Sequence, residues 1–295
     1  MKSKVAEARR SQLLGTFGVG SMFPAPEQSL MICGLDHWRT HPSLEISEQR
    51  LAQSLGVTKL MTPPAGWSAG DVPVVRFPRW YFCPECRRLG PWNSFDTVKN
   101  PRCNKCERDA VPSRFVIACP NGHIDDFPYS RWAHQGHVDE DHVKSNKLSL
   151  VTRGETSSLA DVEIRCTCGA TRTMEGSFSP RSLLGIQGCA GRRPWLPGSP
   201  MEQCQHTPRV MQRGSSSTWF ADVRSAISIP PWSDIHNKVK TSWSMLKDLP
   251  AEVLRSVFTA GGWIPAGSAW TVDDLIQAVS DLRDGTALTD EDRVR

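Results

Sequence analysis

The sequence has no long hydrophobic run and no large excess of charge of one sign. A transmembrane helix needs about 20 consecutive apolar residues, and no such run occurs in this chain of 295 residues. The stretch Met1–Arg10 also lacks the apolar segment of a secretory signal. We therefore expect a cytoplasmic protein that contacts no membrane, with cysteines that stay reduced instead of forming disulfides.

A motif for nucleotide hydrolysis is also missing. Gly15, Gly18 and Gly20 punctuate the stretch Leu14–Phe23, but no Gly-Lys-Ser/Thr follows them, as it would in an ATPase phosphate loop. We favour a turn that packs against the body, with phosphate binding as the alternative. The net charge of +4 permits nucleic-acid binding but does not by itself argue for it.

Ten cysteines are present, and four of them form the strongest signal in the chain. The motifs Cys83-Pro-Glu-Cys86 and Cys103-Asn-Lys-Cys106 are separated by a loop of zinc-ribbon length. One tight turn can present both sulfurs of such a motif to an ion, and two turns complete a tetrahedral site. Because four protein ligands leave no open position, we expect a structural zinc ion; four thiols without metal are the alternative.

A second cysteine group follows later in the chain. It consists of Cys166, Cys168, Cys189 and Cys204, with His206 close behind. Four thiolates, or three with His206 in place of Cys204, would close another zinc site. The alternative is a set of buried thiols without metal. In total we expect two structural zinc ions.

The motif Cys119-Pro-Asn-Gly-His123 leaves three interpretations open. With Asp125 and Asp126 it would form the centre of a metal-dependent nuclease or hydrolase. Cys119 and His123 would form a third metal site if other ligands joined them. We favour local hydrogen bonds and a short helix over Pro128–His134. Three further histidines lie nearby: His134, His137 and His142.

Basic and aromatic residues interleave at Arg76-Phe-Pro-Arg79-Trp80 and at Arg192-Arg193-Pro194-Trp195. Arginine neutralises phosphate and a flat ring can stack on a base, so such mixtures suit single-stranded nucleic acid. The same side chains also stack on one another in ordinary structure. Our candidates for nucleic-acid contact are Arg76, Arg79, Trp80, Arg192, Arg193 and Arg213.

We expect an α+β fold with an irregular, loop-rich, β-rich body that contains a zinc ribbon, and a helical C-terminal part. The expected segments are an N-terminal arm and packing segment (1–70), a zinc-ribbon region (71–125), a β-rich region with the second cysteine group (126–233) and a helical segment (234–295). Strands are predicted at 72–77, 115–118, within 147–174, at 217–223 and at 225–229. Helices are predicted at 46–56, 234–259 and 271–284, the last with a capping box from Thr271 to Asp274.

Six stretches match a pattern found in a known family: Arg10–Gly20, Val72–Cys83, Arg114–Pro128, Gly188–Leu196, Gln212–Gly214 and Ser225–Pro231. Together they resemble DrmB, the family of core subunits in the DISARM antiphage defence systems of bacteria. The resemblance runs from residue 10 to residue 233, and residues 234–295 match only in helical character. DrmB proteins are longer than this chain, so the resemblance implies that it corresponds to their N-terminal half and that 234–295 is the start of a truncated C-terminal region. A fragment, a truncated gene product and half of a split protein are the alternatives.

The resemblance implies a zinc-stabilised accessory subunit that docks on a helicase-like ATPase, DrmA, and helps the complex to engage foreign DNA. The chain itself would then not be an enzyme, since the ATPase lies in the partner. The resemblance also supports zinc at both cysteine groups. The alternatives are the nuclease or hydrolase described above and a free-standing zinc-ribbon regulator of DNA, which would need a basic recognition helix that this sequence does not clearly contain.

Overall fold

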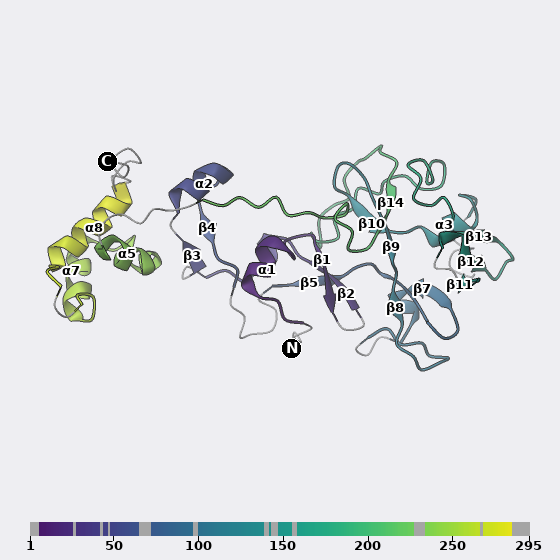
Figure 1. Ribbon diagram of the computed structural model, residues 1–295, viewed down its shortest axis with the longest axis horizontal. Helices are drawn as coiled ribbons and strands as arrows, with labels where there is room; N and C mark the ends of the chain where they lie inside the picture. Colours follow the sequence, from purple (N-terminus) through teal and green to yellow (C-terminus); the bar gives the residue numbers. More distant parts are fainter. Residues whose placement is uncertain are drawn as a thin grey trace. The chain divides into compact units, whose positions relative to one another are not determined.

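The computed structural model describes residues 6–25, 28–41, 44–46, 48–64, 72–96, 100–138, 142, 147–154, 158–226, 234–265 and 268–284. The chain divides into two compact units (Figure 1). The larger unit comprises Met1–Arg39 and Ala65–Ala221, and the smaller unit comprises Thr40–Pro64 and Asp222–Arg295. The expected N-terminal segment 1–70 is therefore shared between the two units.

The largest sheet lies in the larger unit and has six antiparallel strands in the order β13-β12-β11-β7-β6-β8. Its strands are β6 (Trp80–Phe82), β7 (Arg88–Pro91), β8 (Val111–Pro112), β11 (Leu148–Thr152), β12 (Val162–Cys166) and β13 (Thr171–Thr173). The hairpins β6–β7 and β12–β13 each carry a cysteine pair at the turn. Pairing of β7 with β11, where Leu89 lies opposite Leu148, joins these two hairpins in one sheet.

Two smaller sheets complete the larger unit, in the orders β10-β9-β14 and β1-β2-β5. Their strands are β1 (Met22–Ala25), β2 (Gln28–Ile32), β5 (Val74–Arg76), β9 (Phe115–Ala118), β10 (Ile124–Asp126) and β14 (Arg209–Gln212). Short helices accompany the sheets: α1 (Arg10–Gly15), η1 (Leu35–His37), η3 (Trp92–Ser94), α3 (Tyr129–Ala133) and η4 (Leu159–Asp161). Met31, Phe77 and Val116 are fully buried in one core cluster, so the two small sheets share apolar packing.

The main core of the larger unit is aromatic. The ring centroid of Phe127 lies 4.8 Å from that of Tyr129 and 5.6 Å from that of Trp132. The buried polar atoms of these rings have partners, since the Tyr129 hydroxyl lies 2.6 Å from that of Ser113 and Trp132 Nε1 donates to the Thr173 carbonyl at 3.0 Å. These contacts attach α3 to the edge of the six-stranded sheet.

The smaller unit is mainly helical. It contains β3 (Glu45–Ile46), α2 (Gln49–Leu55), β4 (Leu60–Met61), α5 (Asp234–Thr241), α6 (Trp243–Leu246), α7 (Ala251–Ala260) and α8 (Val272–Asp284). Val239, Leu246 and Leu275 are fully buried between the helices. The Glu45 carboxylate lies 3.0 Å from Lys247 Nζ and thereby ties the β3–β4 hairpin to these helices. None of the described helices is long and apolar enough to cross a membrane.

The fold confirms the predicted α+β class, with a β-rich body and C-terminal helices. It also confirms the capping box of α8, in which Thr271 N–H donates to Asp274 Oδ2 at 2.8 Å and Asp274 N–H donates to Thr271 Oγ1 at 3.2 Å. The strand predicted at 217–223 is wrong, because this segment forms a turn and extended chain; β14 pairs with β9 instead. The part of the strand predicted at 225–229 that follows residue 226 lies outside the described residues.

Candidate metal centres

The first group consists of the four ribbon cysteines, Cys83, Cys86, Cys103 and Cys106. Their sulfurs lie within 4.8 Å of one another, and those of Cys86 and Cys103 are 3.7 Å apart. Four sulfurs around zinc, at about 2.3 Å per bond, define tetrahedral edges of about 3.8 Å, whereas a disulfide brings two sulfurs to about 2.05 Å. The spacing fits a shared ion and not a disulfide.

Both Cys-x2-Cys turns use the same backbone pattern. The Cys83 N–H donates to the Arg88 carbonyl at 2.8 Å, and the Arg87 N–H donates to the Cys83 carbonyl at 3.0 Å. The second turn repeats the latter bond between Glu107 and Cys103, at 2.8 Å. The residue after each motif has a positive φ, 64° at Arg87 and 52° at Glu107. This conformation is sparsely populated. It recurs at both equivalent positions because it turns the backbone so that the two thiols of the motif point to the same place.

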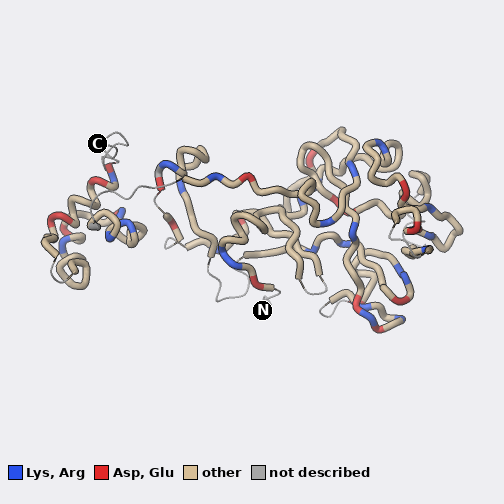
Figure 2. The backbone as a smooth tube through the Cα atoms, in the orientation of Figure 1, with Lys and Arg blue, Asp and Glu red and all other residues tan. Residues whose placement is uncertain are grey.

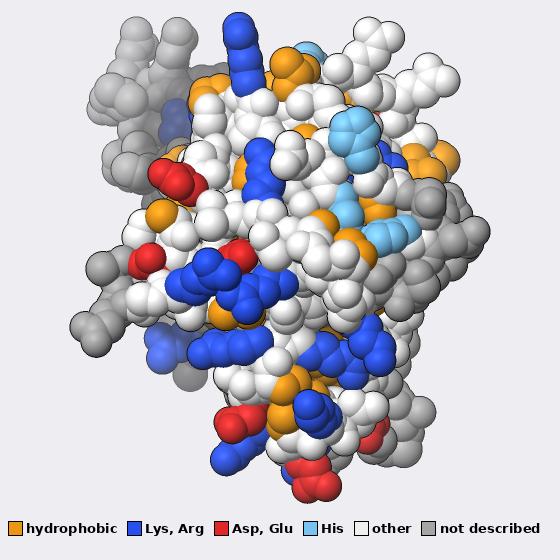
Figure 3. All heavy atoms as spheres, turned by 90° about the vertical axis from the view of Figure 1, so that its right-hand side faces the viewer, with side chains coloured by type: hydrophobic (Ala, Val, Ile, Leu, Met, Phe, Trp, Pro, Cys, Tyr) orange, Lys and Arg blue, Asp and Glu red, His pale blue; other side chains and the backbone are white. Residues whose placement is uncertain are grey.

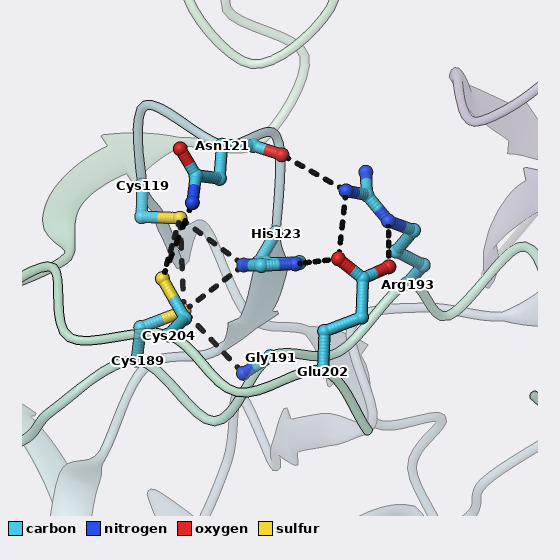
Figure 4. A network of polar contacts seen from close by, with 8 residues as sticks. All are labelled: Cys119, Asn121, His123, Cys189, Gly191, Arg193, Glu202 and Cys204. Atoms are coloured by element: carbon cyan, nitrogen blue, oxygen red, sulfur yellow. Dashed lines mark hydrogen bonds and ion pairs between the residues drawn. The ribbon is translucent and has the colours of Figure 1, made fainter. Parts of the chain in front are cut away.

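The second group consists of Cys119, His123, Cys189 and Cys204 (Figure 4). The Cys119 sulfur lies 3.6 Å from that of Cys189 and 3.9 Å from that of Cys204. His123 Nδ1 lies 3.4 Å from the sulfurs of both Cys119 and Cys189. These values fit the edges of a tetrahedral site with three thiolates and one imidazole, about 3.8 Å between sulfurs and about 3.6 Å between sulfur and nitrogen.

The other ring nitrogen of His123 is held by a carboxylate. His123 Nε2 lies 2.8 Å from Glu202 Oε2, and Arg193 Nη2 donates to the same oxygen at 3.1 Å. Arg193 Nη2 also donates to the Asn121 carbonyl at 3.1 Å, which attaches this chain of contacts to the β9–β10 turn. The hydrogen bonds from Arg193, and then that from His123, lower the pKa of Glu202 to about 2. A carboxylate on the outer nitrogen of a metal-binding histidine fixes the tautomer that presents the inner nitrogen.

A glycine allows the chain just after Cys189 to approach the Glu202 backbone closely. Gly191 has φ +63°, and a Cβ added there would lie 1.7 Å from the Glu202 carbonyl oxygen. The Gly191 carbonyl accepts a hydrogen bond from the Glu202 N–H at 2.9 Å. Residues 187–208 contain no helix or strand, so contacts of this kind, together with the cysteine group, hold the segment in place.

The third group consists of His134, His142, Cys166 and Cys168. His134 Nε2 lies 3.3 Å from the Cys168 sulfur and 2.9 Å from His142 Nε2, and the Cys166 sulfur lies 3.8 Å from His142 Nε2. His134 Nδ1 donates to the Ser130 carbonyl at 2.6 Å, so Nε2 is the ring nitrogen that the side chain presents to this group. Two thiolates and two imidazoles form a donor set typical of structural zinc.

Local hydrogen bonds favour the thiolate form of one cysteine in each of the last two groups. The Ala170 N–H, and then contact with His134, lower the pKa of Cys168 to about 6. The His206 N–H is the main cause that lowers the pKa of Cys204 to about 7. The thiolate is the form that binds a metal ion, so the backbone already favours metal binding at these positions.

The expected second site needs correction. Cys166, Cys168, Cys189 and Cys204 do not form one group but are divided between two, and the described residues offer three four-ligand groups instead of two. Cys166 and Cys168 lie at the β12–β13 turn beside the end of α3. Cys189 and Cys204 belong to the irregular segment 187–208 and contact Cys119 and His123 of the β9–β10 turn. His206 stays outside, with its carbonyl accepting from the Cys189 N–H at 3.2 Å, so Cys204 takes the fourth place.

The residues of the nuclease hypothesis are also divided. Cys119 and His123 belong to the second group, whereas Asp125 and Asp126 contact arginines. Arg79 Nε donates to Asp126 Oδ2 at 2.9 Å, and Arg79 Nη2 donates to Asp125 Oδ1 at 3.2 Å. The two carboxylates therefore anchor an arginine side chain, which does not support a catalytic metal site made from this set.

Four of the six candidate nucleic-acid residues come together. Arg76, Arg79, Arg192 and Arg193 line one hollow of about 330 Å³ in the larger unit, which we call the arginine pocket. The other two candidates lie elsewhere. The Trp80 ring packs at a tilt of 43° against the Tyr129 ring, with centroids 5.3 Å apart, and the Arg213 N–H donates to the Arg114 carbonyl at 2.7 Å. Neither Trp80 nor Arg213 lines the arginine pocket.

The larger unit is thus a β-rich body that carries three groups of four side chains, each able to hold a metal ion. The model of a family described as a domain of unknown function (DUF8724) matches residues 9–220, and the chain belongs to that family. It is also similar to a curated relative, a DISARM protein DrmB of Bacillus paralicheniformis, with 29% identity over 233 residues. The match covers 75% of this chain and 40% of the relative. The chain thus spans less than half of that protein, and the resemblance to DrmB inferred from the sequence is confirmed.

Proposed function

We propose that this chain is a zinc-stabilised accessory subunit of a bacterial antiphage defence complex. The observation that carries the proposal is the similarity to a DISARM protein DrmB over 75% of the chain. The three donor groups support the role of zinc. Each offers four protein ligands, so an ion bound there has no open position for a reacting water, and its contribution would be to structure.

Zinc would connect parts of the chain that are far apart in sequence. In the second group, an ion bound by Cys119 and Cys204 would fasten the irregular segment 187–208 to the β9–β10 turn. In the first group, a bound ion would join the β6–β7 turn to the loop before β8. The buried core of this region consists of few apolar residues, among them Tyr81 and Phe95. Metal binding of this kind adds its free energy directly to folding.

The subunit would dock on a DrmA-like helicase, whose ATPase drives the complex, and would help to engage foreign DNA. Basic and acidic positions are interspersed along the chain (Figure 2), but the face seen in Figure 3 gathers lysine and arginine side chains in a band beside a group of histidines. Such a band attracts the phosphate backbone without reading its sequence. This supports a subunit that engages DNA within a complex.

The test is co-expression of the chain with a DrmA-like helicase, followed by co-purification and measurement of zinc and ATPase activity. We expect a stable complex, bound zinc in this chain, and ATP turnover only when the helicase is present. The Cys189→Ser variant should lose part of the zinc and weaken the complex. Cys33→Ser is the matched control, since Cys33 is outside the groups formed by the described residues. A solitary, metal-free chain, or ATP turnover by the chain alone, would refute the proposal.

A further inference from the structure

The arginine pocket brings together two segments that are far apart in sequence. Arg76 and Arg79 come from β5 and the residues after it, and Arg192 and Arg193 come from the irregular segment 187–208. The Ile124 N–H donates to the Arg192 carbonyl at 3.1 Å, which fixes the second segment against β10. Four arginines that line one hollow form a concentration of positive charge that ordinary packing does not require.

Carboxylates beneath the pocket hold two of these arginines in place. Asp126 and Asp125 have side chains that are only 7% and 19% exposed, while those of Arg79 and Arg192 are 46% and 40% exposed. Arg79 contacts both carboxylates through Nε and Nη2, and Arg192 Nε lies 3.5 Å from Asp125. Within the described part of the chain, Arg79 Nη1 and both Nη groups of Arg192 have no hydrogen-bond partner. Anchored guanidiniums with free outer N–H groups are preorganised to bind an anion.

The other two arginines are positioned as well. The Arg76 guanidinium lies over the Trp92 ring at 5.2 Å, and Arg193 is paired with Glu202, which in turn contacts His123 of the second metal group (Figure 4). Glu202 is the third carboxylate near the pocket, and Arg193 and His123 engage both of its oxygens. Four arginines face three carboxylates, each of which is already engaged, so the open side of the pocket keeps a positive potential.

The remaining wall of the pocket is apolar. It includes Leu196, Pro197, Pro200 and Met201, of which Met201 is 66% exposed. The hollow of about 330 Å³ lies at the small end of the range for ligand sites, about 300–1,000 Å³. A phosphate group alone would leave this wall bare, whereas a phosphodiester with its sugar and base would cover it. Arginine suits phosphate because its fork of N–H groups can bind two oxygens at once.

We propose that the arginine pocket binds a phosphodiester of single-stranded nucleic acid, with the phosphate on Arg192 and Arg79 and the sugar and base against the apolar wall. This inference rests on the proposed function, because the choice of nucleic acid as the ligand comes from the proposed role in engaging DNA. Free phosphate shares the chemistry of the phosphate group but would not use the wall formed by Pro200 and Met201.

The test is fluorescence anisotropy of a labelled oligothymidylate titrated with the full chain over a series of salt concentrations. We expect Arg192→Ala to weaken binding about tenfold and to reduce the salt slope by about one. Arg192→Lys, which keeps the charge but loses the fork, should give an intermediate loss. The matched control is Arg181→Ala, which removes an exposed positive charge outside the pocket and should leave binding within about twofold. Circular dichroism and zinc content should be unchanged in all three variants.

Equal losses in Arg192→Ala and Arg181→Ala would overturn the proposal, because they would indicate general charge attraction. Unchanged binding in Arg192→Ala would also overturn it. We would conclude that the pocket is a free-phosphate site if inorganic phosphate competed as well as unlabelled oligothymidylate at equal phosphate concentration. These outcomes can be told apart from complex formation with a helicase. The complex can form even if Arg192→Ala leaves oligonucleotide binding unchanged, and Arg192 can contribute to oligonucleotide binding even if no complex forms.

Discussion

His123 Nε2 and Glu202 Oε2 lie 2.8 Å apart, although the two residues are separated by 79 positions in the chain. His123 turns its other nitrogen to the thiols of the second group, and Glu202 turns its other oxygen to Arg193. One of the arginines that line the pocket, Arg193, is therefore linked to the second metal group by one continuous set of contacts.

The first prediction concerns metal content. The purified chain should bind three zinc ions, because the described residues form three complete donor groups. Cys189→Ser and Cys166→Ser should each remove about one ion, since the two cysteines belong to different groups. The measurement is elemental analysis by mass spectrometry of protein purified with zinc present. The prediction would be wrong if the chain bound only two ions and both variants lost the same one. The four cysteines Cys166, Cys168, Cys189 and Cys204 would then form the single site expected from the sequence.

The second prediction tests the carboxylate behind His123. Glu202→Gln keeps the shape of the side chain but loses its charge, and should weaken zinc binding at the second group about 10- to 100-fold. The measurement is competition with a chromophoric chelator, in which one of the three ions should be lost at a lower chelator concentration than in the unchanged protein. Glu175→Gln is the control, since Glu175 is an exposed carboxylate outside the three groups. Identical chelator curves for the two variants would show that Glu202 has no part in metal binding.

The third prediction concerns Gly191. Gly191→Ala should abolish or severely weaken the second metal group, because the new Cβ would collide with the Glu202 backbone in a region of positive φ. The neighbouring Gly188 has open space around it and provides the matched control as Gly188→Ala. Zinc content and thermal unfolding distinguish the two variants. Equal behaviour would mean that the segment 187–208 can rearrange without cost.

The fourth prediction concerns pH. The pKa of Cys204 is lowered to about 7 and that of Cys168 to about 6. Above these values the thiol has already lost its proton in the folded chain, and below them a proton competes with zinc. Cys189 of the second group has its pKa raised to about 12, chiefly by burial, so a proton competes with zinc there at higher pH as well. Zinc retention should therefore decline as pH falls and decline more steeply below 7 and then 6, and stability supplied by zinc should decline with it. Chelator competition at a series of pH values measures this, and retention that does not change between pH 8 and pH 5.5 would contradict it.

The sequence was sufficient wherever the chemistry is local. The Cys-x2-Cys motifs predict the first group because one tight turn places both sulfurs, and the strand Phe115–Ala118 and the capping box at Thr271 follow from patterns within a few residues. The signal for the third group was also present, as His134 and His142 stand near one another in the sequence. Nothing in the spacing, however, related these histidines to Cys166.

The sequence by itself determined which residue types are present and that six of the ten thiols occur in pairs at turns, because two ligands held by one turn need only a few consecutive residues. The tertiary structure decided how the pairs and the single cysteines are combined into groups. Cys119 lies beside Cys204 across 85 positions, and His134 lies beside Cys168 across 34. Such encounters depend on strand pairing and on the course of irregular loops, whose closure involves the whole unit, and no periodicity in the sequence records them.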